Sequence, residues 1–238
     1  MTSTSINTPG GAMSSRPLHF FYLCDCSGSM SENGKIQALN SAIRDSIPFM
    51  IAVADNQPGA QLLVRVIKFS DHAEWHIKNP TPVESFVWND LQADATTAMG
   101  EAIRLVAGQL RMPPMDARAL PPVIVLLTDG QATDDAESAI DVLLSLPWGK
   151  KAIRIAIAIG NDADSEVLRK FIGNSELEST RILQAQNADQ LAALIKWAST
   201  AVVKNASAPP STPGGSMPDP VGVIVPPPVT AVGTGDVF

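Results

Sequence analysis

The chain is organised around Asp25-Cys26-Ser27-Gly28-Ser29-Met30, a polar stretch that directly follows an apolar, aromatic-rich run at residues 18–24. The run is short enough to predict a buried strand, so Asp25 falls where that strand ends. In open α/β sheets, ligands bind outside the carboxyl ends of the strands. One carboxylate and two hydroxyls at alternate positions are hard oxygen donors, which suit Mg²⁺ or Mn²⁺ better than zinc or copper. Taken alone, the same turn is equally typical of a side-chain cap for the next helix.

Strand-like and helix-like runs alternate along most of the chain. Apolar residues spaced three or four apart predict helices at about 35–53, 96–111, 136–146, 165–172 and 188–203. Predicted strands lie at 18–24, 61–69, 73–78, 122–127, 152–159 and 181–183. We expect Pro48 to kink or shorten the first helix and Pro147-Trp148-Gly149 to end the third. The alternation predicts an α/β fold with a doubly wound, mostly parallel central sheet and helices on both faces.

Two neighbouring strands break the parallel pattern. Residues 61–69 and 73–78 are separated only by a tight turn, which is too short for a crossover helix. They are therefore predicted to form an antiparallel hairpin. Pro80 and Pro82 suit an edge position, so the later strand is expected at the edge of the sheet.

Two further polar segments are expected near Asp25. Residues 122–127 form a near-continuous Val, Ile and Leu run, as in a parallel strand covered on both faces, and Thr128-Asp129-Gly130 follows it. Thr97 stands at the start of a predicted helix. The three segments are expected to converge at one edge of the sheet.

Length and composition predict a single domain. The 238 residues are 45% hydrophobic, which is enough for one good core. We expect a flexible segment at 1–16, the domain at 17–204 and a disordered Pro/Gly-rich tail at 205–238. The tail is either a linker or a peptide that a partner docks, with residues 221–225 as a strand added to a sheet edge.

Charge and cysteine usage narrow the partners and the compartment. A net charge of -7 argues against a nucleic-acid or an anionic membrane partner. The sequence has neither a signal peptide pattern nor a run of about 20 apolar residues that would span a membrane. Cys24 and Cys26 are too close across the strand end for a good disulfide, so they indicate reduced thiols and a cytoplasmic location.

The sequence offers weak support for an enzyme. His72 and His76 lie on the predicted edge hairpin without a metal-binding cluster, Cys26 has no histidine near it in sequence, and no phosphate-binding loop is present. We therefore expect no catalytic residue. A metal ion that activates water remains an alternative, which would make the protein a metal-assisted hydrolase.

The three polar segments together resemble a known binding site. Asp-x-Ser-x-Ser at 25–29, Thr-x-x-Gly-x-Ala at 97–102 and Thr-Asp-Gly at 128–130 resemble the metal-ion-dependent adhesion site (MIDAS) of von Willebrand factor type A (vWA) domains. The resemblance covers residues 18–203. Within the superfamily, residues 22–30, 35–40 and 159–164 are most similar to the bacterial tellurium-resistance, TerY-like branch.

The resemblance implies a set of metal ligands. Ser27 and Ser29 would bind Mg²⁺, or Mn²⁺ or Ca²⁺, through their hydroxyls, and Thr97 would bind directly or through water. Asp25 and Asp129 would act mainly through bound waters, with direct binding as the alternative. The family usually has a Gly-Gly pair before the threonine. Here Ala95-Thr96 replaces it, so the loop is either stiffer or offers Thr96 as a competing ligand.

The same resemblance implies a function. The expected protein is a Mg²⁺-dependent protein–protein interaction module in which an Asp or Glu of the partner takes the sixth position of the ion. The TerY-like branch implies a bacterial stress or tellurium-resistance system, with a protein kinase or phosphatase as partner. The alternatives are the metal-assisted hydrolase and a scaffold subunit of an ATP-driven chelatase-type complex.

Overall fold

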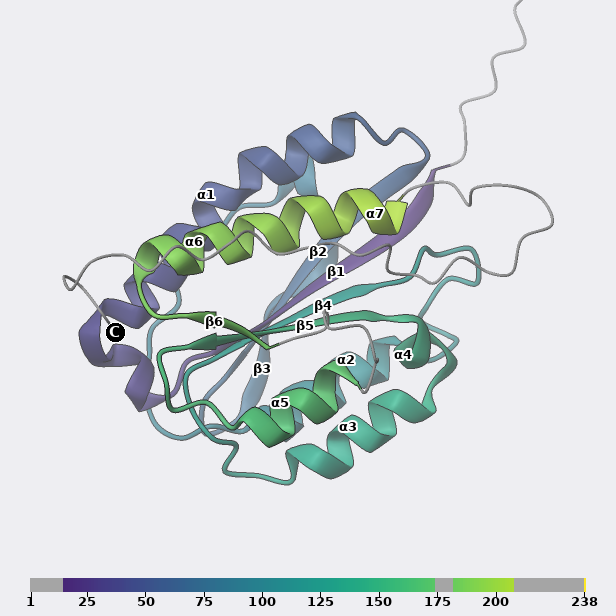
Figure 1. Cartoon of the computed structure of the whole chain (residues 1–238). Helices are drawn as coiled ribbons and strands as arrows, with labels where there is room; N and C mark the ends of the chain where they lie inside the picture. The colour runs from purple at the N-terminus through teal and green to yellow at the C-terminus, as the bar shows by residue number, and fades with distance from the viewer. Residues whose placement is uncertain (1–14, 174–181, 208–237) are drawn as a thin grey trace, which may run out of the picture.

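A six-stranded sheet lies at the centre of the computed structural model, which describes residues 15–173, 182–207 and 238. The strand order is β3-β2-β1-β4-β5-β6 (Figure 1). Only β2 and β3 pair antiparallel, and every other neighbouring pair is parallel. The strands are β1 (Arg16–Asp25), β2 (Ala60–Phe69), β3 (Ala73–Pro82), β4 (Val123–Thr128), β5 (Ile153–Ile159) and β6 (Leu183–Ala185). The predicted α/β fold, with its antiparallel edge strand, is confirmed.

Helices cover both faces of the sheet. The α-helices are α1 (Lys35–Asp55), α2 (Met99–Gln109), α3 (Ala136–Ser145), α4 (Pro147–Lys151), α5 (Ser165–Ile172), α6 (Ala188–Trp197) and α7 (Val203–Ser207). Short helical turns occupy Gly28–Gly34, Val83–Ser85 and Ala198–Val202. Helices α1, α6 and α7 lie on one face, and α2 to α5 lie on the other (Figure 1).

The central strand β1 explains the two-layered core. Its side chains alternate, so Phe20 and Tyr22 contribute to the core under α1 and α6, whereas Phe21 and Leu23 contribute to the core under α2 and α3. All four side chains are fully buried, and burying each one stabilises the fold by about 1.5–3 kcal/mol. The Tyr22 hydroxyl lies 2.6 Å from Ser199 Oγ, which satisfies the polar tip.

Several predicted boundaries need correction. Helix α1 runs through Pro48 to Asp55, so Pro48 does not shorten it, and the alternative of a kink stays a prediction. The buried face of α1 packs on the sheet, and the free energy of this burial offsets the loss of the hydrogen bond that proline removes. Pro147 begins α4 instead of only ending α3, because proline is well tolerated at the first position of a helix.

Three further boundaries shift by a few residues. Strand β3 continues to Pro82, which its edge position permits. Helix α2 begins at Met99, after the turn that holds Thr97. The last strand, predicted at 181–183, lies at Leu183–Ala185.

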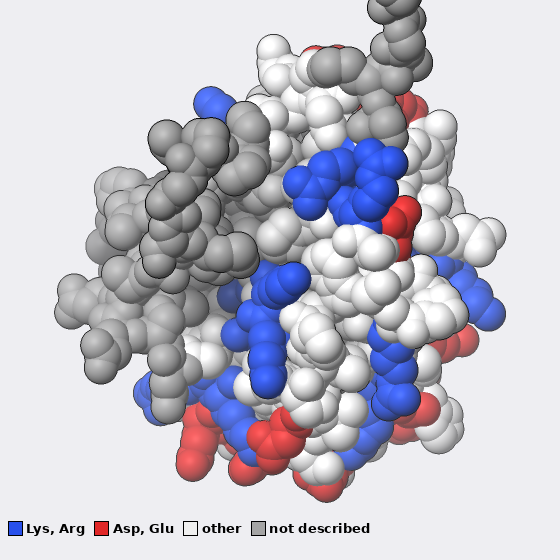
Figure 2. Space-filling view, turned by 90° about the vertical axis from the view of Figure 1, so that its right-hand side faces the viewer, with Lys and Arg blue, Asp and Glu red and all other residues white. Residues whose placement is uncertain are grey.

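The expected ends of the domain are only partly visible. The segment 1–16 and the tail 205–238, including residues 221–225, lie outside the described residues except for 15–16, 205–207 and 238. Within the described part of the chain, none of the helices combines the length and the apolar character needed to cross a bilayer. On the side where β1 begins, Lys and Arg side chains occur in separate groups and Asp and Glu gather mainly toward one rim (Figure 2).

Candidate metal centre

Four of the five predicted ligands meet where β1 and β4 end. These strands are parallel neighbours, with Cys24 opposite Leu127, so the residues that follow them meet at the same edge. Ser29 Oγ donates a hydrogen bond to Asp129 Oδ1 at 2.7 Å. Ser27 Oγ lies 3.1 Å from Ser29 Oγ. The fold therefore brings Asp129, 100 residues later in the chain, into contact with the turn after β1.

The Asp25 carboxylate stabilises the turn that follows β1 through hydrogen bonds. The carboxylate is fully buried, and it accepts a hydrogen bond from the Ser27 backbone N–H at 2.8 Å on Oδ1. Thr128 Oγ1 donates to its other oxygen at 2.5 Å. Burial raises the pKa of Asp25 to about 6, although these hydrogen bonds act in the opposite direction. Asp25 thus both shapes the loop and contributes charge beneath it.

Thr97 completes the set from the loop before α2. Gly130 has no side chain, and a Cβ placed there would lie 3.8 Å from Ser29 Oγ and 3.9 Å from Thr97 Oγ1, so both hydroxyls face the same space. The Thr97 backbone donates to Thr133 Oγ1 at 3.2 Å and accepts from the Thr133 N–H at 3.0 Å. Among the described residues, Thr97 Oγ1 has no hydrogen-bond partner, which leaves it available to a ligand.

Thr96, the alternative ligand, is engaged elsewhere. It is exposed, and both its N–H and its hydroxyl donate to Asp71 Oδ1, at 3.2 and 2.9 Å. The residue before it, Ala95, has a φ of 66°, a left-handed conformation that costs a non-glycine residue about 1–2 kcal/mol. The Ala95 carbonyl accepts from the Gly28 N–H at 2.9 Å, so this strained turn is tied to the turn after β1.

Gly100 of the second segment has a packing role. An added Cβ would lie 2.7 Å from the Asp135 carbonyl oxygen, so only glycine fits. The close approach lets Asp134 accept the N–H groups of Gly100 and Glu101, both at 2.8 Å. These bonds satisfy free donors at the start of α2 and fix the loop that carries Thr97.

The sequence analysis missed Lys35. Its ammonium donates to Asp129 Oδ2 at 2.7 Å, and the two side chains are 7% and 0% exposed. The available signal was electrostatic, because Lys35 is the first residue of α1 and a cation is unfavourable at the amino end of a helix. Such a placement indicates a nearby anion.

The oxygen cluster fits a small divalent cation. Adjacent ligands of an octahedral Mg²⁺ at 2.0–2.1 Å are separated by about 3 Å, and Ser27 Oγ and Ser29 Oγ lie 3.1 Å apart. The described residues hold no group of three or more His, Cys, Asp or Glu side chains arranged for a metal ion. The donor set is therefore hydroxyl-rich and hard, which favours Mg²⁺ over softer ions.

The other candidate residues have different surroundings. His72 precedes β3, whereas His76 lies on it, and His72 Nδ1 lies 3.9 Å from Glu101 Oε2. His76 Nε2 lies 2.9 Å from the Asn89 carbonyl oxygen. Burial raises the pKa of Cys26 to about 12, so its thiol stays protonated at neutral pH and is a poor nucleophile.

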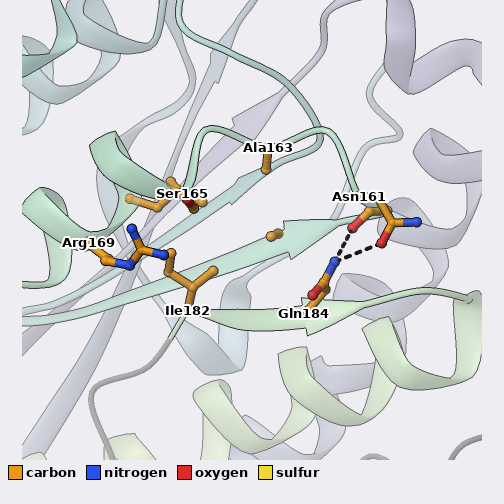
Figure 3. A pocket seen from close by; sticks show the side chains of 9 residues that line it. Asn161, Ala163, Ser165, Arg169, Ile182 and Gln184 are labelled. Atoms are coloured by element: carbon orange, nitrogen blue, oxygen red, sulfur yellow. Dashed lines mark hydrogen bonds between the residues drawn. The ribbon is translucent and has the colours of Figure 1, made fainter. Parts of the chain in front are cut away.

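A pocket lies between β5, β6 and helix α5 (Figure 3). Gln184 closes one side, since its Nε2 donates to the Gly160 carbonyl at 2.9 Å and to Asn161 Oδ1 at 3.0 Å. Ser165 and Arg169 of α5 border the opposite side (Figure 3). Gly160 lines the pocket and also lies near Lys35, since a Cβ added to this glycine would lie 3.7 Å from Lys35 Cε.

Together, the sheet order and the site define a doubly wound α/β domain with a hydroxyl and carboxylate cluster at the carboxyl ends of β1 and β4. The family model for the von Willebrand factor type A domain matches residues 21–197, and the chain belongs to this family. Domains of the family typically bind protein partners and hold a divalent metal ion at the MIDAS. Among curated proteins, no sequence gave a significant match.

Solved structures show the same fold at low sequence identity. The ArnB paralog VWA2 from Sulfolobus acidocaldarius is 19% identical with a TM-score of 0.56, over 77% of this chain and 45% of that one. A von Willebrand factor type A protein from Catenulispora acidiphila is 18% identical with a TM-score of 0.56, over 78% and 42%. Proximal thread matrix protein 1 from the mussel byssus, with a zinc-occupied MIDAS, is 17% identical with a TM-score of 0.54, over 82% and 46%. The chain thus spans less than half the length of these three proteins.

Proposed function

We propose that the protein is a Mg²⁺-dependent protein-interaction module without catalytic activity. The observation that carries the proposal is the cluster of Ser27, Ser29 and Asp129 oxygens, with contacts of 3.1 and 2.7 Å, at the edge of the sheet. Ser29 is exposed, whereas the residues beneath it are buried, so a partner meets the cluster from one side. A bound ion would supply an electrophilic position for an Asp or Glu of the partner.

Each ligand has a distinct role in this proposal. Ser27, Ser29 and Thr97 offer hydroxyl oxygens, and Thr97 takes precedence over Thr96 because the Thr96 hydroxyl donates to Asp71. Asp129 accepts a hydrogen bond from the Ser29 hydroxyl, and Asp25 accepts one from the Ser27 backbone N–H. Both carboxylates would balance the charge of the ion, directly or through water. Mg²⁺ is favoured by the hard oxygen donors, and Mn²⁺ or Ca²⁺ are the alternatives. The zinc-occupied MIDAS of the mussel protein supports a divalent ion at such a site without identifying it.

The same contacts support the part of the proposal that assigns no catalytic residue. Asp25 and Asp129 are the acids of the cluster, and both oxygens of each already accept a hydrogen bond. Asp25 and Asp129 are also almost fully buried, and Asp129 is paired with the Lys35 ammonium. These surroundings favour a role in holding the loops of the cluster over the role of a general base.

A biological setting for this module is proposed from three sequence segments. The similarity of residues 22–30, 35–40 and 159–164 to the TerY-like branch supports a cytoplasmic role in a bacterial stress or tellurium-resistance system. A protein kinase or a phosphatase that presents an acidic residue is the proposed partner. This step rests on sequence similarity alone.

A pull-down with full-length bait tests the function. Lysate of the native host is passed over wild type and over Ser27→Ala/Ser29→Ala, with Mg²⁺ or with EDTA. The expected result is a set of partners that is retained only by wild type and only with Mg²⁺, and that returns when Mg²⁺ replaces EDTA. The serine pair is preferable to Asp25, because Asp25 also holds the fold of the turn.

The control variant is Ser41→Ala/Ser145→Ala, which removes two exposed helix hydroxyls away from the cluster. It should retain the same partners as wild type. Partners that persist in EDTA, or that bind the Ser27→Ala/Ser29→Ala bait equally, would contradict a metal-bridged interaction.

A further inference from the structure

The Lys35 ammonium is built into the candidate metal centre. It lies 2.7 Å from Asp129 Oδ2, while Ser29 Oγ donates to Asp129 Oδ1, also at 2.7 Å. One carboxylate thus joins a lysine on one side to a predicted metal ligand on the other. The lysine side chain is 7% exposed, so solvent screens its charge only weakly.

This placement is unfavourable for a lysine in two respects. Lys35 is the first residue of the 21-residue helix α1, where the helix dipole disfavours a cation. Burial adds a further cost, because an ammonium is strongly hydrated in water. Local rules of this kind are commonly broken at functional sites.

Gly160 lies near the end of the Lys35 side chain, because a Cβ added to this glycine would lie 3.7 Å from Lys35 Cε and 3.9 Å from Nζ. Gly160 has a φ of 75°, which favours glycine, so the backbone conformation itself keeps a side chain out of this space. The fold thus leaves room for the lysine stem beside Asp129.

The charge of Lys35 changes the electrostatics of the site. Asp25 and Asp129 interact with each other and together contribute two negative charges when ionised. A divalent cation would balance these two charges without a remainder. When the Lys35 charge is added, the two carboxylates, the ammonium and the divalent ion together carry one net positive charge.

We propose that Lys35 is a specificity-determining residue, which weakens the binding of a divalent cation and leaves the loaded site positive, so that an acidic ligand is favoured. The proposal rests on the function proposed above and names the regulation of that same site. A positive site attracts the carboxylate of a partner and repels a basic one. The ion is then retained best when the acidic partner is also present.

Mn²⁺ alone is the probe that tests this proposal. The full chain is titrated with Mn²⁺ at neutral pH, and free Mn²⁺ is followed by electron paramagnetic resonance. Lys35→Met should bind Mn²⁺ about tenfold more tightly than wild type, because a repelling charge is removed from a weakly screened site. Lys35→Arg keeps the charge and should stay close to wild type.

Lys170→Met is the matched control. Lys170 also pairs with carboxylates, at 3.3 Å from Glu137 Oε2 and 3.0 Å from Asp141 Oδ2, but these residues lie on α5 and α3. The substitution changes the net charge of the chain by the same amount as Lys35→Met. Its Mn²⁺ affinity should equal that of wild type.

The possible outcomes are separable. Equal or weaker binding by folded Lys35→Met would overturn the role of Lys35 and leave the metal site intact, whereas no binding by any variant would overturn both proposals. Lys35→Gln is the second neutral variant, which replaces the methionine variant if the latter does not fold. Failure of both neutral variants to fold in saturating Mn²⁺ would show that Lys35 is structural, and would also overturn its proposed role.

Discussion

Two buried cations of this domain are held in different ways. Lys35, at the candidate metal centre, contacts the Asp129 carboxylate. Arg65, in the middle of β2, is 5% exposed, and its guanidinium lies 4.5 Å from the Phe21 ring centroid and 5.7 Å from that of Trp75. Its hydrogen bonds go to neutral acceptors, from Nη1 to Gln109 Oε1 at 2.8 Å and between Nη2 and His19 Nδ1 at 3.3 Å.

The difference shows that this fold can bury a cation without a carboxylate. A guanidinium is weakly hydrated and stacks on aromatic rings, so it tolerates burial better than an ammonium. Burial lowers the pKa of Arg65 to about 10, which still leaves it charged at neutral pH. Lys35, as an ammonium, is instead buried with a carboxylate partner, which belongs to the candidate metal centre.

The largest expected effect comes from removing the charge of Asp129. Asp129→Asn leaves the buried Lys35 ammonium without a counter-ion and should lower the free energy of unfolding by about 3–5 kcal/mol. Urea denaturation monitored by circular dichroism measures this change. Lys35→Met/Asp129→Leu replaces the pair by apolar groups and should recover most of the loss. A cost under about 1 kcal/mol for Asp129→Asn would mean that the ion pair behaves as if exposed.

A pH-dependent effect is expected on the Arg65 side. Burial, with the Arg65 charge as a smaller cause, lowers the pKa of His19 to about 4. Between pH 6.5 and 4, His19 therefore binds a proton in the unfolded chain but not in the folded one. Its contribution to the free energy of unfolding is present above pH 6.5 and is lost as the pH falls to 4. The total loss is about 3 kcal/mol.

The comparison of wild type with His19→Gln isolates this contribution. Asp25 titrates in part of the same window in both proteins, so its effect cancels in the difference. The free energy of unfolding of each protein is measured by urea denaturation at several pH values. The stability of wild type relative to His19→Gln should decrease as the pH falls from 6.5 to 4. A pH-independent difference would show that His19 takes up its proton in the folded state as readily as in the unfolded one.

The smallest expected effect is that of Arg65→Met. The variant loses the aromatic contacts and two hydrogen bonds but also avoids the burial of a charge, so the stability at pH 7 should change by only about 1 kcal/mol. The same denaturation experiment measures it beside Asp129→Asn. Equal losses for the two variants would remove the distinction between the two cations.

The parts of the structure that the sequence predicted are those set by local pattern. Apolar runs placed β1 and β4, and because parallel neighbours end at one edge, the meeting of Asp25, Ser27, Ser29 and Asp129 could be expected from topology. The antiparallel hairpin followed from the short turn before Ala73. The metal ligation itself stays a prediction, as do the domain limits.

Other features depend on contacts that no local pattern encodes. The position of Lys35 at the start of α1 indicates an anion but not which one, because its partner lies 94 positions away. Arg65 lies in a strand with alternating residues. Its burial depends on the aromatic rings that pack beside it, such as Phe21, and these belong to other strands. The continuation of α1 past Pro48 reflects packing of the whole helix on the sheet, which outweighs the local signal.

Equilibrium dialysis of the full chain against Mn²⁺ tests the central claim most directly. Wild type should bind one ion per chain, and excess Mg²⁺ should displace it. Ser27→Ala/Ser29→Ala should lower the affinity by at least about tenfold, because both direct hydroxyl donors of the first segment are removed. Binding of equal strength to both proteins, or no binding to wild type, would contradict the assignment of the metal centre.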